Sequence, residues 1–150
     1  MLDFNRINPA IDKDMGFVRV KVKLTNAIDE ALVSRGLLDP NQLRVYETQG
    51  LVDTGAVRMV LPISIVQELG LRIRSYETAK YTDGREEKIG LTEAVIIEVQ
   101  KRETTVAALV MGNEVLIGKT ALVTLDLVVD SKNQCLIPNP KHPNYPIFRI

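Results

Sequence analysis

Hydrophobic and polar residues alternate strictly near the start of the chain, which is the pattern of a strand with one buried face. In residues 17–24 the apolar residues on one side are Val18, Val20, Val22 and Leu24, and the basic residues on the other are Arg19, Lys21 and Lys23. Successive side chains of a β-strand point to opposite faces of a sheet, so a period of two residues indicates a strand. We therefore predict a half-buried antiparallel strand here.

Similar apolar stretches recur along the rest of the chain. They predict strands at residues 42–52, 73–81, 87 onward, 94–99, 105–111, 115–118, 127–129 and 135–137. Asp83-Gly84 separates two alternating runs, and Asp-Gly in that setting is typical of a hairpin turn. A second hairpin is predicted around residues 100–103. Many short strands with frequent turn signals favour a small antiparallel barrel or a sandwich.

Short helical segments interrupt the strand pattern. Asn26 is a suitable N-cap for a helix over residues 27–35 that Gly36 would end, with a long surface connection as the alternative. Residues 64–69 form a second helical stretch, stopped by Gly70, and residues 121–125 suggest a helical turn. The fold class is therefore all-β with one or two short helices.

Composition and charge narrow the possible functions. The chain has 150 residues, 19 Lys and Arg against 19 Asp and Glu, and a single Cys. That length suits one domain, and the balanced charge gives no electrostatic attraction toward nucleic acid or an anionic membrane. No apolar run reaches the ~18 residues that a membrane-spanning helix needs, and the first residues lack the apolar core of a signal peptide. With one thiol, Cys135, and no export signal, we expect a cytoplasmic protein.

The two ends of the chain differ in composition from the middle. Residues 1–15 are polar and aperiodic and are expected to form an arm. The domain is expected to span residues 16–138, and residues 139–150 form a Pro-rich tail. Residues 147–150 are apolar again, and they fit equally well an edge strand on a second subunit or a tail docked on their own chain.

The stretch Leu51-Val52-Asp53-Thr54-Gly55-Ala56 carries the chemistry. Two apolar residues bring the Asp53 carboxylate to the interior at the end of a strand. Thr54 offers a hydroxyl group, and Gly55 lets the backbone turn and approach closely. An ionised carboxylate among apolar residues is costly unless donors surround it, so its placement indicates a function in acid–base chemistry. A structural Asp that caps a turn is the alternative.

The sequence resembles the retropepsin-like aspartic proteases, the single-domain relatives of retroviral protease, and in particular small prokaryotic members. The matching motifs, in chain order, are Asp53-Thr54-Gly55-Ala56, Leu61-Pro62, the hairpin around Asp83-Gly84, Leu116-Ile117-Gly118, the run 125–130 and the segment 136–138. Together they extend from about Gly16 to the tail. The resemblance implies a closed antiparallel β-barrel of the acid-protease type.

The resemblance also implies an aspartic endopeptidase that acts as a homodimer. These enzymes need two carboxylates and this chain has one Asp-Thr-Gly, so the second would be Asp53 of another copy. The resemblance assigns catalysis to Asp53, the active-site loop to Thr54, Gly55 and Ala56, a flap over an extended peptide to Tyr81, Thr82, Asp83 and Gly84, and a supporting loop to Ile117 and Gly118. It requires no metal and no cofactor.

Three features depart from the retroviral pattern. Val57 and Arg58 stand where the retroviral enzymes carry acidic residues, Lys119 stands where they carry Arg, and the hairpin tip is more polar. The alternative function is therefore a non-catalytic module of the same fold that serves dimerisation or peptide binding. In that case Asp53 would be retained for structure.

Overall fold

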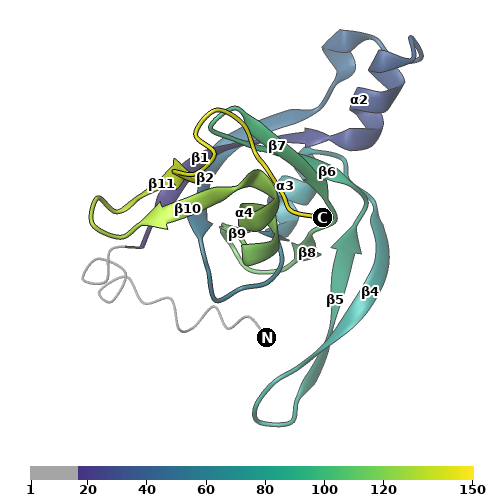
Figure 1. Ribbon diagram of the computed structural model, residues 1–150. Helices are drawn as coiled ribbons and strands as arrows, with labels where there is room; N and C mark the ends of the chain where they lie inside the picture. Colours follow the sequence, from purple (N-terminus) through teal and green to yellow (C-terminus); the bar gives the residue numbers. More distant parts are fainter. Residues whose placement is uncertain (1–16) are drawn as a thin grey trace.

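The computed structural model describes residues 17–150, so the expected arm over residues 1–15 lies outside the described part. A nine-stranded sheet in the order β4-β5-β8-β3-β9-β2-β1-β6-β7 forms most of the fold, and β10 and β11 form a separate two-stranded sheet (Figure 1). The strands are β1 (Arg19–Asn26), β2 (Val45–Val52), β3 (Val60–Leu61), β4 (Ile73–Lys80), β5 (Glu86–Thr92), β6 (Val95–Val99), β7 (Arg102–Val106), β8 (Leu109–Val110), β9 (Val115–Ile117), β10 (Leu127–Asp130) and β11 (Cys135–Pro138).

Within residues 17–150, three α-helices and a short 3₁₀ helix connect the strands. They are α2 (Ala27–Ser34), η2 (Pro40–Gln42), α3 (Ile63–Glu68) and α4 (Lys119–Leu125). The expected N-cap is confirmed, because the Asn26 side chain accepts hydrogen bonds from the backbone N–H groups of Ile28 and Asp29, both at 3.0 Å. The prediction of one or two helices was too low, since all three expected helical stretches form α-helices.

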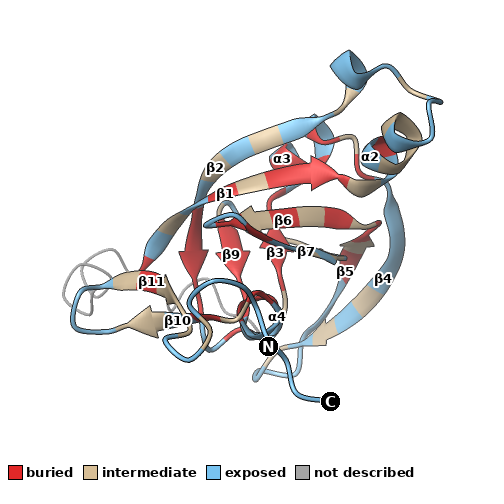
Figure 2. Ribbon diagram, turned by 45° about the horizontal axis from the view of Figure 1, so that its top comes forward, coloured by how far each residue is buried: buried red, intermediate tan, exposed pale blue. Residues whose placement is uncertain are grey.

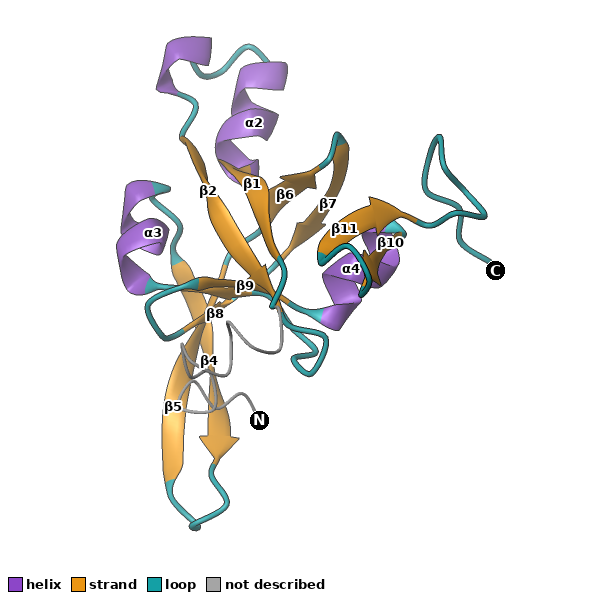
Figure 3. Ribbon diagram, turned by 90° about the vertical axis from the view of Figure 1, so that its left-hand side faces the viewer, coloured by secondary structure: helices purple, strands orange, loops and turns teal. Residues whose placement is uncertain are grey.

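The sheet curls but does not close, so the prediction of a closed antiparallel barrel is wrong. β4 and β7 are the two ends of the strand order and do not pair with each other. The β4–β5 hairpin projects from the body instead (Figure 3), and α4 packs against β7. Two neighbouring pairs, β2 with β9 and β3 with β8, are also parallel. The result is a mixed, half-barrel sheet.

The core lies inside this curl. Val22 and Leu24 of β1 are fully buried and Val18 nearly so, as the alternation predicts, while Val20 is half-buried. Figure 2 shows buried segments gathered on β1, β2, β3, β6 and β9, whereas most of β4 is exposed. Within residues 17–150, no helix is long and apolar enough to cross a bilayer.

The second hairpin is tighter than the sequence indicates. β6 ends at Val99 and β7 begins at Arg102, so only Gln100 and Lys101 form the loop, both with positive φ (51° and 66°). That backbone is the two-residue turn that usually takes Gly or Asn, which the sequence does not provide. The strand expected over 105–111 is divided: β7 ends at Val106, and Leu109–Val110 forms β8 beside β5 and β3.

The tail is fixed to the end of α4 by two charged side chains. Arg102 is buried, and its guanidinium donates to the backbone carbonyls of Leu125 (3.1 Å), Asp126 (2.8 Å) and His142 (2.7 Å). The Asp126 carboxylate accepts from the Asn139 side chain at 2.9 Å, from the Ile147 N–H at 3.1 Å, and contacts His142 Nδ1 at 2.6 Å. Hydrogen bonds therefore hold the tail on its own chain as far as the Ile147 N–H, although the side chains of residues 143–150 are all exposed.

Candidate active site

Asp53 lies directly after β2, where that strand pairs in parallel with β9. Its backbone N–H donates to the Ile117 carbonyl at 3.1 Å, one step beyond the Val52–Ile117 pair in the ladder. The residue is only 5% exposed. The buried end of β2, residues 50–52, thus carries the carboxylate into the interior, as the run Leu51-Val52 predicts.

The loop after Asp53 turns tightly around its carboxylate. Gly55 N–H donates to Asp53 Oδ1 at 3.0 Å, and Ala56 N–H donates to the Asp53 carbonyl at 3.1 Å. Ala56 is buried, whereas Thr54 and Gly55 are exposed. The loop therefore fixes the Asp53 carboxylate through the Gly55 N–H and leaves Thr54 and Gly55 on the molecular surface.

The backbone at Gly118, which the resemblance assigns to a supporting loop, packs directly against the Asp53 loop. A Cβ atom at Gly118 would lie 2.5 Å from the Arg58 carbonyl oxygen, a separation that no side chain tolerates. Two backbone hydrogen bonds reinforce the contact, from Lys119 N–H to the Ala56 carbonyl (2.7 Å) and from Thr120 N–H to the Val57 carbonyl (3.0 Å). The first turn of α4 thus fixes the backbone of residues 56–58.

A surface cleft of about 290 Å³ opens beside the carboxylate. Its lining residues are Phe17, Val18, Val52, Asp53, Thr54, Val129 and Ser131. Three regions distant in sequence meet there: the entry to β1, the Asp53 loop and the β10–β11 hairpin. The contribution of Val129 and Ser131 was not predicted, because no local pattern shows which hairpin will flank a loop some 75 residues earlier.

The expected flap is the β4–β5 hairpin, which turns at Asp83-Gly84 as predicted. Tyr81 N–H donates to the Arg85 carbonyl at 2.8 Å, and Gly84 adopts a positive φ of 89°. Thr82, Asp83 and Gly84 are exposed at the tip. In Figure 1 this tip and the loop after β2 project toward the same side of the molecule, while α2 lies at the opposite end.

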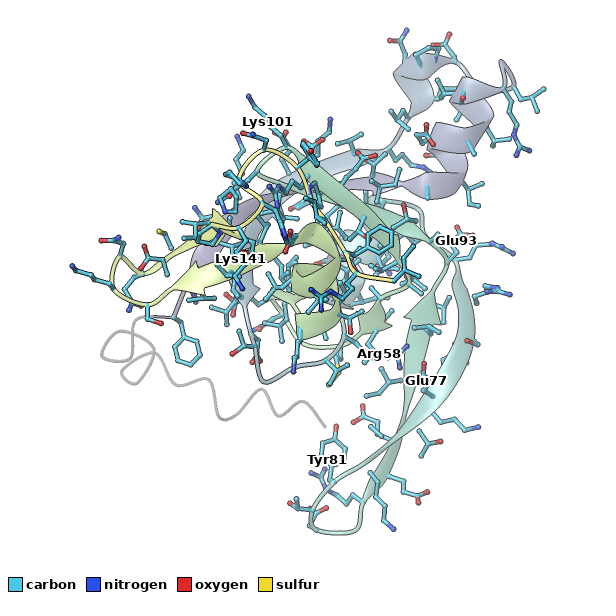
Figure 4. The ribbon with its side chains drawn as sticks, in the orientation of Figure 1. Arg58, Glu77, Tyr81, Glu93, Lys101 and Lys141 are labelled. Atoms are coloured by element: carbon cyan, nitrogen blue, oxygen red, sulfur yellow. The ribbon has the colours of Figure 1, made fainter. Side chains whose placement is uncertain are left out.

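Arg58 joins the Asp53 loop to the base of this hairpin. Its guanidinium donates to Glu77 Oε1 of β4 at 2.6 Å, and Figure 4 shows the two side chains meeting well short of Tyr81. The hydrogen bond with Glu77 raises the pKa of Arg58, and the same bond lowers the pKa of Glu77. The basic residue that departs from the retroviral pattern therefore has an acidic partner in the same chain.

Comparisons with known proteins support the fold at the level of structure. The sequence matches no protein-family model and no curated protein. Among solved structures it is similar to the retroviral protease-like domain of Ddi1 from Leishmania major, with a TM-score of 0.51 and 17% identity. The match covers 88% of this chain and 95% of that domain. The chain therefore has a retropepsin-like fold. The match does not extend to a small prokaryotic subgroup in particular.

Proposed function

We propose that this protein is an aspartic endopeptidase that acts as a homodimer, with one Asp53 from each copy. The observation that carries the proposal is the setting of Asp53: a buried carboxylate at the end of β2, held by the Gly55 N–H at 3.0 Å and open to a cleft. The retropepsin-like fold adds support, because a loop of this kind occupies the same place in that class of enzyme.

The chemistry follows from bringing two such carboxylates together. Two carboxyl groups about 3 Å apart cannot both be ionised, because their like charges repel, so the pair would share one proton. The ionised member acts as general base on a water molecule, and the protonated member donates to the oxygen of the scissile carbonyl. Water attacks the carbonyl carbon, the C–N bond then breaks, and the amine leaves with a proton.

The exposed loop residues suit the remaining tasks. Thr54 and Gly55 lie on the surface beside the cleft, where a twofold-related copy and a substrate backbone could contact them. An extended peptide would bind as an added strand through main-chain hydrogen bonds, and the β4–β5 hairpin would cover it and exclude water.

One observation favours a second candidate, a non-catalytic dimerisation or peptide-binding module. The Asp53 carboxylate accepts a hydrogen bond from its own loop, as a purely structural Asp in a turn would. In that function the acid would stabilise the turn, and the cleft would bind a peptide without cutting it.

The test is cleavage of an unstructured protein, such as denatured casein, by the wild type and by Asp53→Asn from about pH 3 to 7. The substitution is nearly isosteric, so the fold should persist while cleavage is lost. Asp39→Asn is the matched control, because Asp39 caps η2 at the far end of the molecule and Asn caps equally well. Equal cleavage by Asp53→Asn and wild type would refute the proposal. A wild type that binds the unstructured protein but does not cleave it would favour the non-catalytic binding module.

A further inference from the structure

The strand β4 is an edge of the nine-stranded sheet. Within the described residues β5 is its only neighbour, and Figures 1 and 2 show no other strand along its outer side. Most of its eight residues are exposed. An unpaired edge of this length presents a row of backbone N–H and C=O groups, which is a template for pairing with another strand.

The backbone groups that face this free edge belong to alternate residues. Tyr81 N–H donates to the Arg85 carbonyl, and the register with β5 runs without a break from Lys80 back to Ser75. In an antiparallel ladder every second residue bonds to a given neighbour, so the odd residues of this run bond to β5. The outward groups are those of the even residues, Tyr76, Thr78 and Lys80.

Few of the features that usually protect an edge strand occur along residues 75–80. The β-bulge lies at the start of the strand, between Ile73 and Ser75, and the strand has no proline. Tyr76 is 64% exposed, and aromatic residues favour cross-strand pairs. The chain has 19 acidic and 19 basic residues, so net charge does not keep two copies apart.

Symmetry and charge select one register for pairing with a second copy. Two antiparallel edges bond only where outward-facing residues lie opposite each other, so in a symmetric pair one residue lies on the twofold axis. Glu77 on the axis would bring two carboxylates face to face, and Lys80 would bring two ammonium groups together. Tyr76 on the axis would run the ladder into the bulge. With Thr78 on the axis, residues 76–80 of both copies pair without like charges.

The side chains that meet in this register are complementary. Thr78 would lie opposite its own copy, and Tyr76 of each chain would lie opposite Lys80 of the other. An ammonium group beside an aromatic ring makes a cation–π contact, and Thr–Thr pairs are favourable between strands. Glu77 would face the small side chain of Ala79. The sheets of the two copies would thus continue into each other at this edge.

We propose that β4 is a self-association surface, at which residues 76–80 of two copies pair antiparallel about Thr78. None of the residues that line the cleft beside Asp53 belongs to β4. The inference goes beyond the proposed function and does not depend on it, so Asp53→Asn should associate through β4 as the wild type does. The contact is small, and the association should therefore be weak and concentration-dependent.

Disulfide trapping in a Cys135→Ser background, which lacks the native thiol, tests the register. Thr78→Cys should form a disulfide-linked dimer under mild oxidation, because opposite Cα atoms of a bonded pair lie about 5.5 Å apart. Tyr76→Cys is the matched control. Its two copies would be about 14 Å apart along the strand, beyond the roughly 7 Å that a disulfide spans, so they should not cross-link. Mixing Tyr76→Cys with Lys80→Cys should restore cross-linking.

Sedimentation equilibrium gives a second measurement that needs no cysteine. Over about a hundredfold range of concentration, the average mass of the wild type should rise above that of Thr78→Pro. The proline removes one outward N–H and no bond to β5. Tyr76→Lys should lose the same association, because two lysines would then lie opposite each other. Tyr145→Lys, at a tyrosine with the same 64% exposure, is the control and should behave as the wild type.

Pairing at β4 can be separated from a dimer built on Asp53, because the second would persist in Thr78→Pro and the first in Asp53→Asn. Equal cross-linking of Thr78→Cys and Tyr76→Cys, or equal masses for wild type and Thr78→Pro, would overturn the proposal. If circular dichroism shows that Thr78→Pro is unfolded, the mass of Tyr76→Lys decides instead. Unchanged masses together with weaker binding of an extended peptide by Thr78→Pro would assign the edge to a peptide partner, and would also overturn it.

Discussion

Gly118 approaches the backbone of Arg58 so closely that a Cβ atom at position 118 would lie 2.5 Å from the Arg58 carbonyl oxygen and 2.7 Å from its carbon and nitrogen. The contact joins the start of α4 to the loop that carries Asp53. The obstacle is backbone and not a movable side chain. The geometry of the candidate site therefore depends on the absence of a side chain at this position.

Gly118→Ala is expected to destabilise the protein by about 1–3 kcal/mol, the usual cost of forcing an extra methyl group into a packed region. It should also lower the rate of cleavage by more than the loss of folded protein explains, because the Asp53 loop has to shift. Misplacements of about 1 Å in a catalytic site cost roughly 10²-fold in rate. Chemical denaturation and the cleavage assay check the two effects.

Gly50→Ala provides the comparison. A Cβ there meets the end of the Ile117 side chain at 3.0 Å, and a side chain can rotate away where a backbone cannot. Its cost should therefore be clearly smaller than that of Gly118→Ala. Equal costs for the two substitutions would contradict the importance of the Gly118–Arg58 contact.

Arg102→Met should free the tail. The buried guanidinium donates hydrogen bonds to three backbone carbonyl oxygens. A carbonyl that is buried without a donor typically costs about 1–3 kcal/mol. Because two of the carbonyls are only partly buried and can take up water, we expect a total loss of about 1–3 kcal/mol. Limited proteolysis within residues 139–147 should accelerate as well.

Lys101→Met removes a neighbouring charge that is exposed in the β6–β7 turn and serves as the matched control. It should leave both the unfolding free energy and the proteolysis of the tail nearly unchanged. If Arg102→Met behaves like Lys101→Met, the tail is held by something other than the buried guanidinium.

The contacts between the Asp126 carboxylate and the tail predict that the stability of the protein depends on pH. The Asn139 hydrogen bond, followed by the Ile147 N–H and His142, lowers the pKa of Asp126 from 3.8 to about 2. The unfolded chain therefore binds this proton more readily than the folded one. The stability that the carboxylate contributes is complete above about pH 4 and is lost as the pH falls toward 2.

In Asp126→Asn the free energy of unfolding should accordingly fall less steeply as the pH is lowered. Asp126 adopts a left-handed backbone (φ 56°) that Asn tolerates well, so the substitution removes the titration and leaves the turn intact. Urea unfolding between pH 5 and 2 measures the difference between the two proteins. A constant difference across this range would mean that Asp126 carries no acid-sensitive stability.

Local patterns in the sequence were sufficient for much of this fold. The alternation at Val18 to Leu24, the Asn26 cap and the Asp83-Gly84 turn each depend on neighbouring residues, and each is found in the structure. The loop at Asp53 and the glycine at 118 also come together, because β2 pairs in parallel with β9; only the family resemblance, and no local pattern, indicated this.

Features that depend on distant residues were not predicted correctly. The prediction of a closed barrel was wrong because β4 and β7, the ends of the strand order, do not pair: β4 belongs to a hairpin that leaves the body (Figure 3), and α4 packs against β7. No local pattern indicates that His142 of the Pro-rich tail is half-buried against Asp126, sixteen residues earlier. Arg102 was expected in a turn, because Gln100 and Lys101 do not signal the left-handed backbone that they adopt.

The central claim is that two copies of Asp53 form one site, and mixing subunits tests it most directly. Wild type and Asp53→Asn are unfolded together in equal amounts, refolded, and assayed at constant total concentration. If each site needs both carboxylates, random pairing leaves wild-type homodimers as only about a quarter of the dimers, and activity falls to about a quarter of the pure wild-type value. Activity that stays at about one half would show that each chain carries a complete site, and would contradict the account.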